Sequence, residues 1–392
     1  MSEWKCYKLS EISSLSNGIN FDKSAYTSGV KLIGVSDFKN RIHPDYDSLQ
    51  EVDSKVVKSG DYLEKGDIVF VRSNGNKELV GRCMMIDRDV SVTYSGFCIK
   101  LRLKDKKRFE PVFFNYLFRT RYFKKSMTGT AVGANIQNLS QSRLGNCEVN
   151  VPDIETQKRI ATILSCYDSL IENYQKQIKL LEEAAQRLYK EWFVDLHFPG
   201  HENTKIVDGV PEGWEKKKVA DVVVFYDKMR KPLSSMQRQS MEKIYPYYGA
   251  ASLMDYVDNY LFDGTYLLMG EDGTVISNEK YPMLQYVWGK FWVSNHAHVL
   301  QGKEPYSTEF IYMMLKQMTI LDVVTGAAQP KISQGRLAAK EIIMPANELV
   351  KEYDKIVVPM IQQAKSLQSQ IRLLTEARDR LLPKLMSGEI TV

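Results

Sequence analysis

The chain of 392 residues carries a formal net charge of +5, with 44% hydrophobic and 26% charged residues. This ordinary composition excludes collagen-like and fully disordered classes, and the length predicts two or three domains. No apolar run is long enough for a transmembrane helix or a secretory signal, and five widely spaced cysteines without a Cys-x-x-Cys pair favour a reducing cytoplasm over a disulfide framework or a zinc finger.

Residues 1–151 form the first expected domain. Strand-like apolar runs at Asp67–Val71 and Phe97–Leu101 are separated by Gly and Asn turns, and Val112–Phe118 predicts a short aromatic helix. Lys and Arg outnumber Asp and Glu by 24 to 17 in this segment. A basic excess of this kind suits a polyanion such as DNA, although it is a weak signal alone.

Residues 152–198 predict one long helix. Apolar or small residues recur at alternating steps of three and four, which is the period of a coiled coil. The expected seam consists of Ile160, Ile163, Tyr167, Leu170, Tyr174, Leu181, Ala184 and Leu188. At 1.5 Å per residue, a helix of about 35 residues is about 50 Å long, which exceeds a small domain.

The remaining chain repeats this plan. Residues 199–213 are rich in Gly and Pro and predict a linker, and residues 214–345 predict a second β-rich domain. Its strands are expected at Tyr266–Met269 and Tyr286–Trp288, and its short helix at Glu309–Leu315. Residues 346–392 predict a second long helix and a tail, with a kink or a late helix start at Pro359.

The two halves are related by duplication. With a shift of 193 residues, 18 of the 50 positions between residues 139 and 188 are identical to residues 332–381 without a gap. Trp4 and the apolar residues after it match Trp214 at a shift of 210, so the middle of the first half is longer. Two divergent domains on two matched helices suggest different ligands on one frame, and the helices are expected to pack on each other.

Motifs for several catalytic classes are missing. No Gly-Lys pair precedes Ser or Thr as in a P-loop, no Pro-Pro dipeptide exists for an amino-methyltransferase loop, and no Gly-x-Gly-x-x-Gly opens a helix. A nuclease cluster at Asp87, Asp89 and Asp105–Lys107 is a weak candidate. His296 and His298 would share a strand face, where a polar surface or a DNA contact is favoured over a metal.

The order and spacing of several short segments carry a resemblance over the whole chain. They are Leu63–Val69, Gly129–Ala131 with Asn138–Ser140, Val151–Pro152, Glu155–Ile160, Pro211–Trp214, Tyr247–Ala250, Tyr260–Gly264, Gly270–Gly273, Gly326–Ile332 and Leu381–Gly388. Together they resemble the DNA specificity subunit of a Type I restriction-modification system. The chain departs from the family pattern at Asn347–Val350, where the expected Gln is missing, and at Gly133–Asn135, where the second half has Gln329–Lys331.

The resemblance implies an α+β fold. Two β-rich mixed α/β target recognition domains are each followed by a long helix, and the helices pair as an antiparallel coiled coil. Each domain would read one half of a bipartite asymmetric site in double-stranded DNA. The chain itself would bind no cofactor and catalyse nothing. Two adenine methyltransferase (modification) subunits would supply S-adenosylmethionine, and motor-nuclease (restriction) subunits would use ATP and Mg.

Candidate DNA contacts divide into phosphate-binding cations and bidentate base readers. The expected cations include Lys104, Lys106, Lys107, Arg108, Arg119, Arg121, Lys124 and Lys125, then Lys216–Lys218, Lys228, Arg230 and Lys231. The expected base readers are Arg72, Asn74, Asn76, Asn135, Gln137 and Asn138 in the first half, and Arg238, Gln285, Gln329 and Lys331 in the second. Lys77 is included as a DNA contact beside Asn76. A solvated surface or a simple turn is the competing reading for each.

Three alternatives remain open from the sequence. A stand-alone DNA enzyme lacks its motifs, and a coiled-coil assembly adaptor would not need two divergent β-rich domains. The third is the same recognition fold in a related fused (Type IIB-like) restriction system. An adjacent methyltransferase gene and a helicase-nuclease gene would favour Type I.

Overall fold

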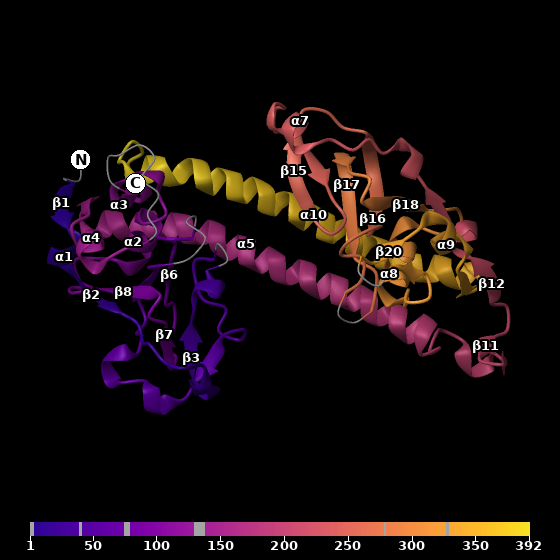
Figure 1. Cartoon of the computed structure of the whole chain (residues 1–392), viewed down its shortest axis with the longest axis horizontal. Helices are drawn as coiled ribbons and strands as arrows, with labels where there is room; N and C mark the ends of the chain where they lie inside the picture. Colours follow the sequence, from indigo (N-terminus) through magenta and orange to yellow (C-terminus); the bar gives the residue numbers. More distant parts are fainter. Residues whose placement is uncertain (1–3, 39–40, 74–78, 129–137, 278–279, 327–328) are drawn as a thin grey trace. The chain divides into compact units, whose positions relative to one another are not determined.

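In the computed structural model, both segments with a coiled-coil period are helices: α5 (Ile154–Tyr189) and α10 (Asn347–Met386) (Figure 1). The structure describes residues 4–38, 41–73, 79–128, 138–277, 280–326 and 329–392. These divide into unit 1, residues 1–173 with 371–392, and unit 2, residues 174–370. Each long helix therefore contributes one part to each unit. Within the described ranges, no helix is both long and apolar enough to cross a membrane.

The two long helices pack on each other within each unit, and α5 runs from unit 1 into unit 2 while α10 runs from unit 2 into unit 1. In unit 1 the Arg378 guanidinium contacts the Asp168 carboxylate, and in unit 2 the Tyr353 hydroxyl donates to the Ala185 carbonyl at 3.0 Å. The contact pairs are thus Asp168 with Arg378 and Ala185 with Tyr353. The residue number rises in α5 and falls in α10 from one pair to the next, so the two helices run in opposite directions. The pairing predicted from the heptad pattern is confirmed.

The seam predicted for α5 is wrong at two positions. Leu170 is 42% exposed and Ala184 is exposed, whereas the next residues, Ile171 and Ala185, are buried. A straight α-helix has 3.6 residues per turn, so its buried face drifts against a strict 3.5-residue repeat. Helix α5 also packs against its domain, which broadens the buried face beyond a two-helix seam.

Helix α10 is continuous through Pro359, so a late start there is wrong. An interior proline removes one backbone hydrogen bond and costs about 3 kcal/mol. Pro359 lies on the exposed face, while Val357 and Ile361 are buried in the core of unit 2. Burial of that apolar face, at about 25 cal/mol per Å², offsets the cost and holds the first turns helical.

Unit 1 contains two main sheets. A four-stranded sheet has the order β2-β8-β5-β6, a three-stranded sheet has the order β4-β3-β7, and β1 pairs with β9. The elements are β1 (Lys5–Lys8), α1 (Leu9–Ile12), β2 (Ser13–Asn17), β3 (Tyr26–Ile33), β4 (Gln50–Val52), β5 (Ile68–Val71), β6 (Cys83–Met85), β7 (Val92–Tyr94), β8 (Cys98–Leu103), α2 (Pro111–Leu117), α3 (Arg121–Thr128), α4 (Gln141–Gly145) and β9 (Glu148–Val151).

Unit 2 is built on a six-stranded sheet of order β13-β18-β16-β17-β14-β15, with β12 pairing to β21. The elements are β10 (Ile206–Val207), β11 (Val210–Pro211), β12 (Glu215–Lys218), α6 (Val219–Val222), β13 (Val223–Phe225), α7 (Ser235–Gln239), β14 (Tyr245–Tyr248), β15 (Leu253–Val257), β16 (Phe262–Gly270), β17 (Leu284–Val293), β18 (Ala297–Gly302), α8 (Thr308–Gln317), β19 (Val324–Thr325), β20 (Lys331–Ile332), α9 (Gln334–Ala339) and β21 (Glu341–Met344).

The predicted duplication is confirmed by matching hydrogen bonds in the two units. The backbone N–H of Leu9 donates to Cys147 O at 3.0 Å, and that of Val219 donates to Lys340 O, also at 3.0 Å. In each unit these bonds fix the first short helix beside the strand that leads into the long helix. The order β2-β8-β5-β6 in unit 1 corresponds to β13-β18-β16-β17 in unit 2.

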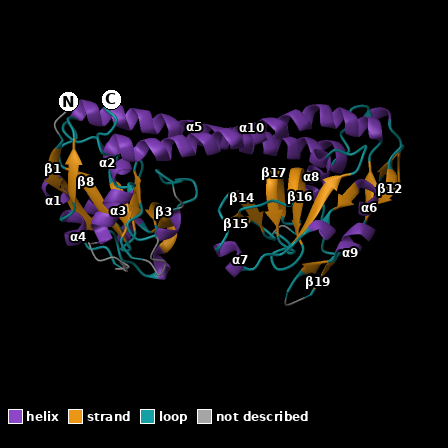
Figure 2. Ribbon diagram, turned by 90° about the horizontal axis from the view of Figure 1, so that it is seen from above, coloured by secondary structure: helices purple, strands orange, loops and turns teal. Residues whose placement is uncertain are grey.

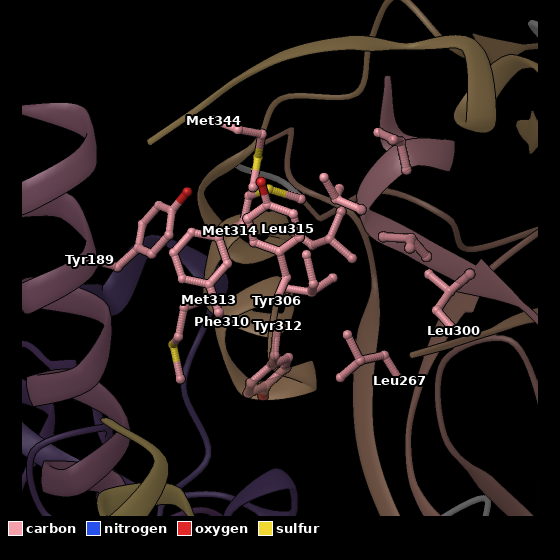
Figure 3. Packing of buried hydrophobic residues seen from close by; sticks show 14 of the residues in the cluster. Tyr189, Leu267, Leu300, Tyr306, Phe310, Tyr312, Met313, Met314, Leu315 and Met344 are labelled. Carbon is pink, nitrogen blue, oxygen red and sulfur yellow. The ribbon is translucent and has the colours of Figure 1, made fainter. Parts of the chain in front are cut away.

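The aromatic helix of each unit joins the sheet to the long helices (Figure 2). In unit 2, Phe310 and Leu315 of α8 share one buried core with Leu267 and Leu300 of the sheet and with Tyr189 of α5 (Figure 3). In unit 1, the buried phenylalanines of α2 share a core with Ile160 and Leu164 of α5 and Leu385 of α10. Both short helices were predicted from sequence.

Gln157, in the family-like segment Glu155–Ile160, makes a buried polar contact that the second half of the chain lacks. Gln157 of α5 is 1% exposed, donates to the carbonyls of Arg108 and Pro152, and accepts from the Glu110 backbone at 2.9 Å. These bonds tie the loop before α2 to the start of α5. The equivalent residue in α10, Val350, is instead buried in the apolar core of unit 2.

Candidate nucleic-acid interface

The predicted base readers Arg72 and Asn138 lie on neighbouring segments at one edge of unit 1. The Arg72 carbonyl, just after β5, accepts from Leu139 N at 2.8 Å, and a β-bridge joins Ser73 to Asn138. The Arg72 backbone N–H donates to Phe97 O at 2.7 Å, in the turn before β8. Three segments that are distant in sequence, those of Arg72, Phe97 and Asn138, therefore meet where strand β5 ends.

Unit 2 has the same three segments joined by the same bonds. Glu271 follows β16, its carbonyl accepts from Ile332 N at 2.8 Å, and its N–H donates to His296 O at 2.8 Å. A β-bridge joins Asp272 to Lys331, as Ser73 joins Asn138 in unit 1. Arg72 therefore corresponds to Glu271, Phe97 to His296, and Asn138 to Lys331. We call these two places the strand-end edges.

The strand-end edge of unit 1 offers hydrogen-bonding side chains suited to base edges. Asn138 is exposed, and Arg72 is half-buried with one long bond from its Nη1 to Gly96 O at 3.4 Å. Arginine pairs with guanine and asparagine with adenine through two hydrogen bonds each. Five other predicted DNA contacts fall outside the described residues: Asn74, Asn76, Lys77, Asn135 and Gln137.

The strand-end edge of unit 2 carries Gln329 and Lys331, both exposed. Lys331 Nζ lies 3.6 Å from a Glu271 carboxylate oxygen, a contact loose enough for an exposed amine to exchange. Lys228 and Lys231 are exposed on the segment after β13. These cations suit phosphate contacts.

Arg230 lies in a buried ion cluster beneath this edge. Its Nη1 donates to Glu271 Oε2 at 2.6 Å and to Ala297 O at 2.7 Å, and 13% of its side chain is exposed. The Asp227 carboxylate accepts from Val299 N and contacts His298 Nδ1 at 2.6 Å. Arg230 thus has a structural role, and its assignment as a DNA contact stays a prediction.

Within the described part of the chain, one group of carboxylates and imidazoles lies close enough to hold a single metal ion. It consists of Asp227, Glu271 and His298. The Arg230 guanidinium already supplies a positive charge to Glu271 and Asp227. His298 is buried with both ring nitrogens facing oxygens, those of Asp227 and Ile332. His296 lies outside this group, half exposed against Asp272. The two histidines therefore do not share one site.

The side chains of two other candidates in unit 2 make hydrogen bonds within the domain. Arg238 stacks on the Tyr247 ring, with its Cζ 4.7 Å from the centroid, and its Nε donates to Asp255 at 3.2 Å. Gln285 Nε2 donates to Gly249 O at 3.0 Å. Both side chains hold loops of the six-stranded sheet in place, so their DNA contacts stay predictions.

The basic residues of unit 1 separate into two groups. Lys106 and Lys107 are exposed near the start of β5, where Lys106 Nζ donates to Lys65 O at 2.8 Å. Arg119, Arg121 and Lys124 instead line a cavity of about 1140 Å³, together with Asp168 of α5 and Arg378 of α10. Arg119 donates to the carbonyls of Arg41 and Cys83. The cations predicted as one phosphate-binding cluster therefore lie in two places.

The weak nuclease candidate is an ordinary hydrogen-bonded loop. Asp87 accepts from the Tyr46 hydroxyl at 2.8 Å and pairs with Arg88 at 3.2 Å. Burial raises the pKa of Asp87, but the hydrogen bonds from Arg88 and Tyr46 outweigh it and the net pKa is lowered. Asp67, in the family-like segment Leu63–Val69, accepts both a backbone bond from Glu64 and the Arg102 guanidinium. It closes the turn before β5.

Comparison with known proteins agrees with this architecture. The family model described as "Type I restriction modification DNA specificity domain" matches residues 1–183 and again residues 211–371. The chain belongs to this family.

Its specificity-domain relatives span bacteria and archaea. The "Type I restriction enzyme MjaIX specificity subunit" of Methanocaldococcus jannaschii is 27% identical over 71% of this chain and 68% of its own length. The "Type I restriction enzyme HindI specificity subunit" of Haemophilus influenzae is 22% identical over the full length of both chains. A solved S subunit of a Type-I restriction-modification system from M. genitalium shares the fold, with a TM-score of 0.62, 18% identity, and coverage of 98% of this chain and 96% of that one.

Proposed function

We propose that this chain is the sequence-specific DNA-binding subunit of a Type I restriction-modification complex. Each unit would read one half of a bipartite asymmetric target in double-stranded DNA. The observation that supports this most directly is the pair of strand-end edges, which share one backbone frame and carry different side chains. A common frame with different side chains is what two readers of different sequences require.

The side chains at the edges suit base reading more than catalysis. Arg72, Asn138, Gln329 and Lys331 supply donors and acceptors in the combinations that distinguish bases in the major groove. Exposed cations near the edge of unit 2, such as Lys228 and Lys231, would position the duplex through its phosphates, whereas Lys106 and Lys107 lie at the other end of β5. Of the three residues that resemble a metal site, Asp227 and Glu271 already pair with the Arg230 guanidinium, so the group would not serve as a reaction centre.

The chain is proposed to be non-catalytic and to act in the cytoplasm within a larger assembly. Two adenine methyltransferase subunits would bring S-adenosylmethionine, and motor-nuclease subunits would use ATP and Mg. The proposed domain boundaries are 1–151, 152–198, 199–213, 214–345 and 346–392 for the first recognition domain, first helix, linker, second recognition domain and second helix with its tail.

A domain exchange tests this function. The gene is expressed in its host with residues 1–150 replaced by those of another family member, and adenine methylation is mapped across the genome. We expect one half of the methylated motif to change and the other half to remain. A change in the sequence of both half-sites together would overturn the proposal. Methylation by the purified chain without partner subunits would also overturn it.

A further inference from the structure

The duplicated frame places one exposed ring at the same position in both units. Phe97 lies in the turn before β8 and is 62% exposed. His296 lies in the turn before β18, and 50% of its side chain is exposed. The backbone carbonyl of Phe97 accepts a hydrogen bond from the N–H of Arg72, which follows β5. The carbonyl of His296 accepts one from the N–H of Glu271, which follows β16. Their positions are equivalent by hydrogen-bond register, although the sequences around them differ.

The residue that follows each ring is buried, so each exposed ring stands at the point where the chain enters its strand. Cys98 after Phe97 and Ala297 after His296 both lie in their strands with no exposed surface. An exposed phenylalanine contributes little to the free energy of folding, because most of its apolar surface stays in water. Its backbone bonds to Arg72, which also bonds the Asn138 segment, and this place at the strand-end edge gives Phe97 a different use.

We propose that Phe97 and His296 are specificity-determining residues, each contacting a base in the half-site read by its own unit. This inference rests on the proposed function and names the residues through which that function discriminates bases. A phenyl ring makes apolar contact with a thymine methyl or a base face, and an imidazole hydrogen-bonds a base edge. The two half-sites would therefore be read by one apolar and one polar group at equivalent positions.

Asp272 acts as a positioning residue for His296. Its Oδ1 lies 2.7 Å from His296 Nδ1, and a carboxylate only accepts, so Nδ1 donates. This bond fixes the ring plane and leaves Nε2 as the ring atom for a base. Asp272 is itself held by the β-bridge to Lys331. Phe97 needs no such partner because an apolar contact has no preferred hydrogen-bond direction.

The test uses the intact complex in a host that lacks its own copy of the gene. Wild type, Phe97→Ala and His296→Ala are each expressed with the partner subunits, and the methylated motif is mapped. We expect Phe97→Ala to relax one or two base positions in one half-site and His296→Ala to relax positions in the other. Binding of each purified complex to the cognate duplex should weaken by about tenfold, equivalent to about 1.4 kcal/mol.

Matched controls separate base contact from general effects. Tyr122→Ala removes another exposed aromatic of unit 1, 65% exposed on α3, and His201→Ala removes a partly exposed imidazole of the interdomain linker. Both are expected to keep the wild-type motif. Asp272→Ala should resemble His296→Ala, whereas Asp272→Asn keeps an acceptor for Nδ1 and should restore the motif.

The possible outcomes are distinct. If Phe97→Ala and His296→Ala leave the motif and the affinity unchanged, or relax the same half-site, the inference is wrong. Equal effects from the two control variants would also overturn it. If the wild-type complex methylates no bipartite motif, the proposed function itself fails and the inference fails with it.

Discussion

At the residue scale, one buried carboxylate holds three elements of unit 1 together. Asp168 of α5 is 5% exposed, accepts from the Tyr116 hydroxyl of α2 and pairs with Arg378 of α10. Burial raises the pKa of Tyr116, and the Asp168 charge raises it further, so the phenol remains a donor. The interaction joins the recognition domain to both long helices.

Asp168→Ala is expected to lower the free energy of unfolding by about 3 kcal/mol, because it leaves the buried Tyr116 hydroxyl without its acceptor and removes the buried partner of the half-buried Arg378 guanidinium. Asp379→Ala removes the other carboxylate on Arg378, which is 59% exposed, and should cost less than about 1 kcal/mol. Urea denaturation of the full chain, with hydrogen exchange of α2 and the end of α10, measures both. Equal losses would show that burial of Asp168 is not the cause.

The cluster of Asp227, Glu271 and His298 gives a second prediction. Because Arg230 already pairs with Glu271 at 2.6 Å, a divalent ion would have to displace a guanidinium. We expect the melting temperature to be the same after dialysis against a chelator and after addition of Zn²⁺. A rise in melting temperature with Zn²⁺ in the wild type, lost in His298→Leu, would contradict this assignment.

The surroundings of individual residues follow from the sequence only in part. Arg72 and Asn138 stay predicted base readers because of their side-chain chemistry, and the structure adds that their backbone segments are bonded to each other. Phe97 is the first residue of the predicted apolar strand Phe97–Leu101, which favours a core position, and only the fold shows that its side chain is exposed. The structural role of Arg230 was invisible because Glu271 is 41 residues away.

At the element scale, the two long helices differ at their first residue. Asp153 caps α5, accepting from Thr156 N at 3.0 Å and from the Thr156 hydroxyl at 2.8 Å. The equivalent position before α10 is Ala346, which has no side-chain acceptor. The duplication therefore supplies a natural comparison of a capped and an uncapped helix.

Asp153→Ala should destabilise the chain by about 1 kcal/mol, and Ala346→Asp should stabilise it by a similar amount. The backbone and hydroxyl bonds from Thr156 lower the pKa of Asp153. A lowered pKa gives stability that is present above the ordinary value, about 4, and is lost as pH falls through the folded-state value. The difference between wild type and Asp153→Ala should therefore shrink below about pH 4. Urea denaturation followed by helical circular dichroism tests this, and a difference independent of pH would argue against the cap.

The long helices show which structural features the periodicity of apolar residues predicts and which it does not. Their existence, length and pairing followed from steps of three and four residues. Their buried face did not, because the core of unit 2 takes up Ala185 in place of Ala184, and Ile171 is buried in place of Leu170. The continuity of α10 through Pro359 likewise depends on a core that a local rule does not contain.

At the scale of the whole molecule, both long helices pass from one unit into the other. The division between the units falls after Asn173 in α5 and after Gln370 in α10. If each unit reads one half-site, the helical segments at these positions govern the unread spacer. Because the helices are antiparallel, an insertion after Asn173 paired with one after Gln370 lengthens both by the same amount.

Four added residues in each helix lengthen it by about 6 Å and rotate it by about 40° beyond a full turn. Duplex DNA rises about 3.4 Å per base pair and turns by about a tenth of a revolution. The spacer between the methylated half-sites should therefore grow by one or two base pairs, with the half-site sequences unchanged because neither strand-end edge is altered. A matched control inserts the same four residues at Gly209, in the linker turn, where nothing lies within 4 Å of an added Cβ. Genome-wide methylation mapping reads both variants, and an unchanged spacer in the helix variant, or an equal change in the linker variant, would show that α5 and α10 do not set the distance.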